Sequence, residues 1–79
     1  MTIKVYSTPV CPWCDKVKEY LTSKGVPFVN VDISKDRGAA IDMIKKTYQM
    51  AVPVTMCGDE FVVGYDTQKL DNLIEKSQN

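Results

Sequence analysis

This sequence of 79 residues has no histidine, no net charge and only three cysteines. Without histidine there is no imidazole to act as a base, and a closed zinc site would need three cysteines and a carboxylate. Ten basic and ten acidic residues cancel, so no net field attracts nucleic acid or an anionic membrane surface. The apolar runs are far too short to span a bilayer. We expect a protein without bound metal, nucleic acid or membrane.

The cysteines Cys11, Cys14 and Cys57 form an odd and small set. A secreted domain held together by disulfides usually has an even and larger number. The chain passes directly into a strand pattern, without the charged, apolar and small-residue segments of a secretion signal. We therefore expect a cytoplasmic protein, in which Cys57 packs as a small apolar residue.

Four short β-rich segments are separated by helical patterns. Alternating residues predict strands at 3–7 and 27–33, and the runs "VPVTMC" and "EFVVG" flank a "GD" turn that predicts a hairpin. Helical periodicity follows Pro12, a cap at Ser34 or Asp36, and a cap at Asp66. We expect the three helices to bury Cys14, Val17 and Leu21, then Ile41, Ile44 and Tyr48 with Ala40 beside them, and finally Leu70, Leu73 and Ile74.

The predicted order of elements is β-α-β-α-β-β-α, which belongs to the α/β class. A strand, a crossover helix and a second strand form a right-handed parallel pair, and the later hairpin is antiparallel. A four-stranded mixed sheet flanked by three helices follows. The sequence shows no linker or repeat, so we assign residues 1–79 to a single domain.

The stretch "YSTPVCPWCDKVKEYL" places two cysteines where the first strand gives way to the first helix. Unpaired backbone N–H groups and the helix dipole favour an anion there, which lowers the pKa of a thiol. We expect Cys11 to be the exposed nucleophile and Cys14 the buried thiol that resolves a mixed disulfide. A structural disulfide or two unreactive thiols are the alternatives.

Three motifs carry a resemblance to a known family. The segments "YSTPVCPWC", "AVPV" and "VVGYD" resemble those of glutaredoxins, in particular the short glutaredoxin-like redoxins, and the similarity covers essentially the whole chain. The resemblance implies a thioredoxin-like fold, dithiol–disulfide oxidoreductase activity and a cis Pro53 beside the dithiol. A cis Pro53 would turn the main chain of Val52 toward an extended substrate, and Trp13 offers an apolar face to the same partner. Asp66 matches the family's acidic position at the glutathione γ-glutamyl end, with a plain helix cap as the alternative.

Some positions depart from the pattern of glutathione-using members. Thr8 stands where a lysine is usual, and Val63 and Gly64 replace a pair of glycines. We therefore expect weak turnover of glutathione. We also expect a monomer that binds no cofactor and reduces disulfides in client proteins. Glutathione or a thioredoxin-reductase-type flavoenzyme could supply its electrons, the latter being typical of redoxins that serve ribonucleotide reductase. A glutaredoxin that holds a [2Fe–2S] cluster is the alternative of another class.

Overall fold

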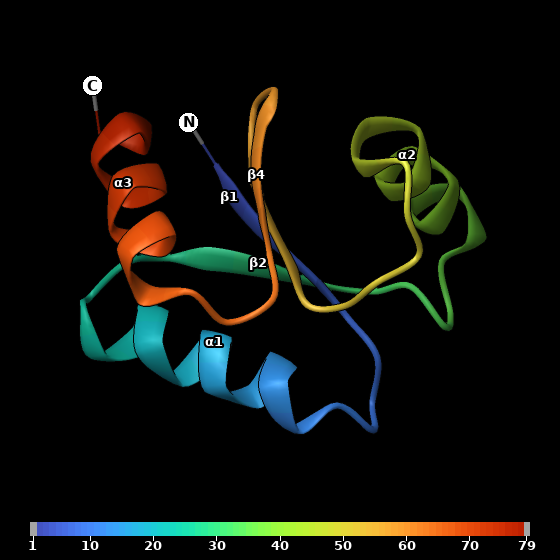
Figure 1. The fold of residues 1–79 in the computed structure, drawn as a ribbon. Coiled ribbons are helices and arrows are strands. Elements are labelled where there is room, and N and C mark those ends of the chain that lie inside the picture. The colour runs from blue at the N-terminus through green and yellow to red at the C-terminus, as the bar shows by residue number, and fades with distance from the viewer. Residues whose placement is uncertain (1, 79) are drawn as a thin grey trace.

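A computed structural model describes residues 2–78, which form one four-stranded sheet and three helices (Figure 1). The elements are β1 (Ile3–Ser7), α1 (Pro12–Ser23), β2 (Phe28–Asp32), α2 (Arg37–Thr47), β3 (Val54–Cys57), β4 (Glu60–Val63) and α3 (Thr67–Ser77). The strand order is β2-β1-β3-β4, with β1 parallel to β2 and the other pairs antiparallel. The predicted α/β class, element order and mixed sheet are confirmed.

The helices cover both faces of the sheet (Figure 1). Helices α1 and α3 share one face, where Val17 and Leu21 pack with Leu70 and Leu73 over the buried strand residues. Helix α2 covers the other face, where Met43 packs with a second cluster of Tyr6, Val54 and Met56. Alternation along β1 and β3 divides their side chains between the two cores, as expected of strands buried on both sides. No helix among residues 2–78 is long and apolar enough to cross a membrane.

Side chains at the starts of all three helices accept backbone hydrogen bonds. Asp36 caps α2 by accepting from the N–H of Ala39 at 3.0 Å, and Asp66 caps α3 by accepting from the N–H of Lys69 at 3.2 Å. Helix α1 begins in a different way, because its capping acceptor is the sulfur of Cys11. The predicted cap at Asp66 is confirmed, and Asp36 rather than Ser34 caps the second helix.

The predicted buried face of α2 is wrong. Ile41, Ile44 and Tyr48 are exposed, whereas Ala40, Met43 and Thr47 face the sheet. Both sets have helical spacing, and the set in which the large Met43 is flanked by the small Ala40 and by Thr47 is the one that packs against the strands. The Thr47 hydroxyl can be buried because it donates to the Met43 carbonyl at 2.8 Å. Tyr48 ends the helix in a left-handed conformation with φ of 59° and lies outside the core.

Two polar or reactive side chains of β3 are buried in the core. Cys57 is 3% exposed and packs in the cluster beneath α1 and α3, as expected. Thr55 is fully buried, and its hydroxyl has no hydrogen-bond partner within residues 2–78. A buried hydroxyl without a partner destabilises the folded state, because it has lost its hydrogen bonds to water.

Candidate functional site around the dithiol

The two cysteines of the strand-to-helix junction come together at the start of α1. Their sulfurs lie within disulfide-bonding distance, and their Cα atoms are 5.2 Å apart. Cys14 is completely buried, because it lies on the face of α1 that packs against the sheet. Cys11 precedes the helix and is half-buried, so it is the more accessible cysteine of the two. The expected difference in exposure between the cysteines is present.

The sulfur of Cys11 takes part in the hydrogen bonding of the helix start. The backbone N–H of Cys14 donates to Cys11 Sγ at 3.1 Å, and the N–H of Asp15 donates to the Cys11 carbonyl at 3.2 Å. A charged sulfur at this place would gain from the same donor and from the positive end of the helix dipole. The junction therefore favours a thiolate without the help of a base.

A shallow groove lies beside the dithiol. It has a volume of about 270 Å³ and is lined by Trp13, Val52, Pro53, Gly64 and Tyr65. The Val52–Pro53 peptide bond is cis, as the family resemblance implies, and the Pro53 carbonyl accepts from the Gly64 N–H at 2.8 Å. Gly64 has φ of 83°, a left-handed conformation that glycine adopts without strain. The groove brings together three of the expected substrate-binding residues, from segments far apart in the sequence.

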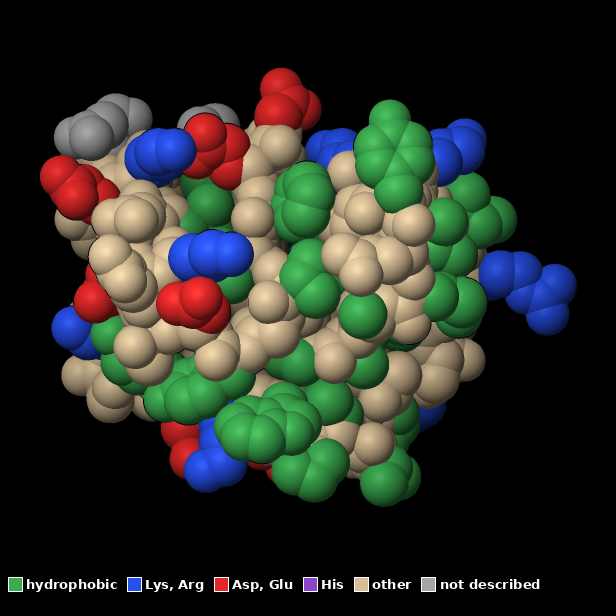
Figure 2. Space-filling view, viewed as in Figure 1, with side chains coloured by type: hydrophobic (Ala, Val, Ile, Leu, Met, Phe, Trp, Pro, Cys, Tyr) green, Lys and Arg blue, Asp and Glu red, His purple; other side chains and the backbone are tan. Residues whose placement is uncertain are grey.

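Aromatic side chains form one side of this groove. Trp13 is 57% exposed, and its ring stacks on that of Tyr65 with centroids 6.2 Å apart. Tyr20 meets the other part of Tyr65 edge-on at 6.2 Å. Figure 2 shows hydrophobic side chains gathered along the lower edge of the molecule, over the start of α1 and the preceding loop. Sequence reasoning missed Tyr65, although it lies within the motif "VVGYD".

The hydroxyl of Tyr20 anchors this aromatic row to α3. It donates to the Asp71 carboxylate at 2.6 Å, and Lys24 lies 3.7 Å from the same carboxylate. The hydrogen bond to Asp71 is the main reason why the pKa of Tyr20 is raised above its usual value. The ring of Tyr65 is thereby held between the first turn of α1 and a fixed neighbour.

Asp66 lies one residue beyond Tyr65 and does not line the groove. It is half-buried, with one carboxylate oxygen engaged in capping α3. Val63, one of the two residues that replace the family's glycine pair, is partly buried and packs against the core cluster beneath α2. Part of the Val63 side chain is thus turned toward the core, and the predicted effect of Val63 on glutathione binding stays a prediction.

Thr8 borders a separate polar hollow of about 240 Å³ before the first cysteine. Two lysines line the same hollow: Lys18 from α1 and Lys35 from the turn after β2. Lys18 also lies 3.6 Å from the Asp15 carboxylate. Asp32 lines this hollow as well, so both signs of charge are present on this side of the junction, and Thr8 itself supplies none.

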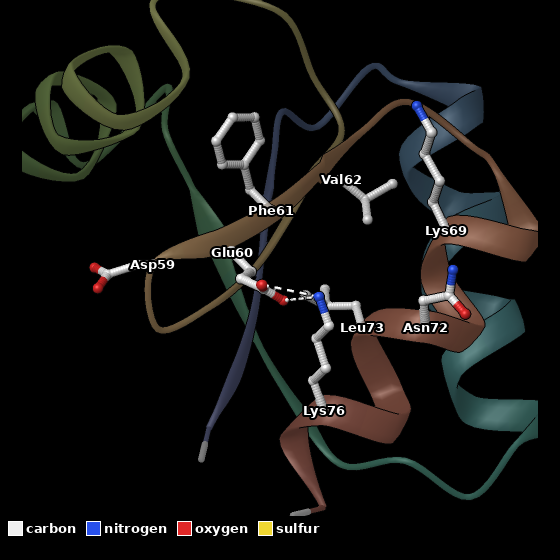
Figure 3. Close-up of a pocket in the computed structure, with 8 residues that line it drawn as sticks. All are labelled: Asp59, Glu60, Phe61, Val62, Lys69, Asn72, Leu73 and Lys76. Carbon is white, nitrogen blue, oxygen red and sulfur yellow. Dashed lines mark hydrogen bonds and ion pairs between the residues drawn. The ribbon is translucent and has the colours of Figure 1, made fainter.

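A further hollow, of about 300 Å³, lies between β4 and α3 (Figure 3). Glu60 and Lys76 form an ion pair of 2.8 Å across it, and Val62 and Leu73 form part of its lining. None of its lining residues belongs to the dithiol junction or to the groove beside it. We assign it no part in the chemistry of the cysteines.

Comparisons with a family model, with known sequences and with solved structures all point to the same family. A glutaredoxin family model matches residues 3–62. A glutaredoxin-like 8.6 kDa protein of the rubredoxin operon of Clostridium pasteurianum is 45% identical, over 94% of this chain and 99% of that protein. Glutaredoxin 3 of Escherichia coli is 30% identical over 81% of this chain and 77% of its own length. The crystal structure of a glutaredoxin from Archaeoglobus fulgidus superposes with a TM-score of 0.84 at 30% identity, covering 91% of this chain and 84% of that one.

These similarities agree with the architecture and with the paired sulfurs at the junction of β1 and α1. The fold is thioredoxin-like, and members of the matched family exchange thiols and disulfides. The chain belongs to the glutaredoxin family and is a dithiol–disulfide oxidoreductase.

Proposed function

We propose that this protein reduces disulfides in client proteins, with Cys11 as the attacking thiol and Cys14 as the resolving thiol. The Cys11 thiolate attacks one sulfur of the client disulfide, forms a mixed disulfide and releases the other client sulfur as a thiolate. The Cys14 thiolate then attacks Cys11 Sγ, releases the second client thiolate and leaves the Cys11–Cys14 disulfide. Two electrons pass to the client, and an external donor restores the dithiol.

The observation that carries this assignment is the difference in burial between the two cysteines. Cys14 is completely buried against the sheet, so a client disulfide reaches Cys11 first. The backbone N–H of Cys14 stabilises negative charge on Cys11 Sγ, which favours the nucleophilic form. With no histidine in the chain, the helix start has to supply this activation.

Client segments bind in an extended form beside the dithiol. The backbone N–H and carbonyl of Val52 make no hydrogen bond within residues 2–78, so both are free to pair with an extended segment as a sheet edge does. Pro53 holds this backbone next to the groove, and Trp13 offers an apolar surface to the same segment. We assign to Asp66 a contact with a cationic group of the substrate, such as the γ-glutamyl ammonium of glutathione.

The electron donor is a thioredoxin-reductase-type flavoenzyme in preference to glutathione. Thr8 supplies no charge for a glutathione carboxylate, and no charged side chain lines the groove. Lys18 and Lys35 line the hollow beside Thr8, but they come from α1 and from the turn after β2, and Lys18 forms an ion pair with Asp15. We further propose that residues 1–79 act as a single domain and as a monomer. A cytoplasmic location fits the proposed chemistry, since cytosolic reductants keep such thiols reduced.

Two experiments test this function. Cys14→Ser should accumulate a mixed disulfide at Cys11 when it reacts with a disulfide-bonded client, whereas Cys11→Ser should form no adduct and show no turnover. Mass spectrometry locates the adduct, and adducts at Cys14 would contradict the assignment. NADPH oxidation in paired assays, with thioredoxin reductase or with glutathione and its reductase, identifies the donor. Faster turnover with glutathione would contradict the preference for a flavoenzyme.

A further inference from the structure

The groove beside the dithiol is walled by uncharged side chains. Trp13 and Tyr65 provide two stacked rings, Val52 and Pro53 provide aliphatic surface, and Gly64 leaves one side without a side chain. Lys16 lies over the Trp13 ring, 5.8 Å from its centroid, but it does not line the groove, so the lining itself offers apolar surface and no charge. The groove therefore suits an apolar group.

The position of Tyr65 is fixed by its neighbours. Its ring is stacked on Trp13 at 6.2 Å and contacted edge-on by Tyr20 at 6.2 Å, and Tyr20 is itself anchored by Asp71. The ring is 38% exposed, so one part of it packs and the rest is free for contact. The Tyr65 hydroxyl makes no hydrogen bond within residues 2–78, so the ring is the part of the side chain that shapes the groove.

An occupant of the groove must reach it while its sulfur reacts at Cys11. The groove lies next to the dithiol, because Trp13 stands between the two cysteines and lines it. An extended polypeptide paired with the free backbone of Val52 projects alternate side chains toward the protein. One side chain near the reacting cysteine can then enter the groove.

From this geometry we infer that Tyr65 determines substrate specificity, by forming with Trp13 a subsite for an apolar side chain close to the reacting cysteine of a client polypeptide. This inference rests on the proposed reduction of protein disulfides and specifies which clients react best. Leucine, isoleucine or phenylalanine near the cysteine increases the rate of attack, because burial of its apolar surface holds the disulfide at Cys11. A small polar residue at the same position gains nothing from the rings.

The test uses the pre-reduced protein and peptides with one cysteine, each joined by a disulfide to the same coloured thiol. The parent peptide has serine at the two positions on either side of cysteine, and four derivatives replace one serine each with leucine. Release of the coloured thiol in a single turnover gives a second-order rate constant without any electron donor. We expect leucine at one of the four positions to raise that constant about tenfold.

Variants then assign this gain to Tyr65. In Tyr65→Ala the ratio of the leucine to the serine peptide should fall below about twofold, whereas Tyr65→Phe should keep the wild-type ratio because it keeps the ring. Tyr48→Ala is the matched control, since it removes an 89% exposed tyrosine at the end of α2 and should leave the ratio and the rates unchanged.

Three outcomes would overturn the inference. If no position favours leucine while the peptides are still reduced, the subsite does not exist and the proposed function stands. If the gain persists in Tyr65→Ala, or is lost equally in Tyr48→Ala, then Tyr65 does not form it. If the wild-type dithiol reduces none of the peptides, the proposed function fails and this inference fails with it.

Discussion

Asp66 joins the stability of α3 to the substrate contact assigned to its carboxylate, and two substitutions separate these roles. The carboxylate accepts a hydrogen bond of 3.2 Å from the N–H of Lys69, a geometry that asparagine can reproduce and alanine cannot. Asp66→Ala should therefore lower the free energy of unfolding by about 1 kcal/mol, and Asp66→Asn by only a few tenths. For a domain of this size 1 kcal/mol corresponds to about 4–8 °C in Tm. Thermal unfolding followed by circular dichroism measures the difference.

Turnover of a glutathione mixed disulfide measures the other role of Asp66. If its charge meets a substrate ammonium group, Asp66→Asn should lower kcat/KM about threefold to tenfold while Tm stays near that of the wild type. Asp36→Ala is the matched control, because Asp36 caps α2 in the same way, with a 3.0 Å bond to the N–H of Ala39. That variant should lose similar stability and keep its kcat/KM. Full turnover by Asp66→Asn would show that Asp66 is a helix cap only.

Three further predictions concern other parts of the chain. Thr8→Lys should raise glutathione-dependent kcat/KM about threefold to tenfold in the coupled assay, and no change would refute the argument from Thr8. Asp71→Ala should bring the raised pKa of Tyr20 back toward 10.0, which an ultraviolet titration of tyrosinate measures. In the wild type, the stabilisation from the Tyr20–Asp71 hydrogen bond is present below pH 10 and is lost as the pH rises through the raised pKa. Thr55→Val should raise the free energy of unfolding by about 1 kcal/mol in urea, since it removes a buried hydroxyl without a partner, and a loss of stability would indicate a partner for that hydroxyl.

Most of the fold could be predicted because the sequence signals were local. Strand alternation, the "GD" turn and the aspartates at 36 and 66 each act within a few residues, and the structure places strands and caps accordingly. The buried face of α2 could not be predicted in this way, because two sets of residues share the helical period. Packing against the sheet buries Met43 with its small or hydroxylated neighbours, and leaves Ile41 and Ile44 exposed.

The residues of the site likewise fall into those that the sequence predicts and those that only the folded structure brings together. The cysteine pair and Pro53 stand in short motifs that can be recognised from the sequence alone. The aromatic wall depends on residues 13 and 65, which are far apart in the chain and meet only because α1 and the turn before α3 lie side by side. No local pattern in the sequence indicates such a contact.

The sulfur that caps α1 links the helix to the redox state of the protein. A thiolate at Cys11 is a charged acceptor for the N–H of Cys14, whereas the sulfur of a disulfide is a weak and neutral one. The first turn of α1 is therefore held more firmly in the reduced protein than in the oxidised protein. That difference favours the dithiol over the disulfide and shifts the redox equilibrium toward a more oxidising couple. The helix start thus helps to set which clients the protein can reduce and which donors can recharge it.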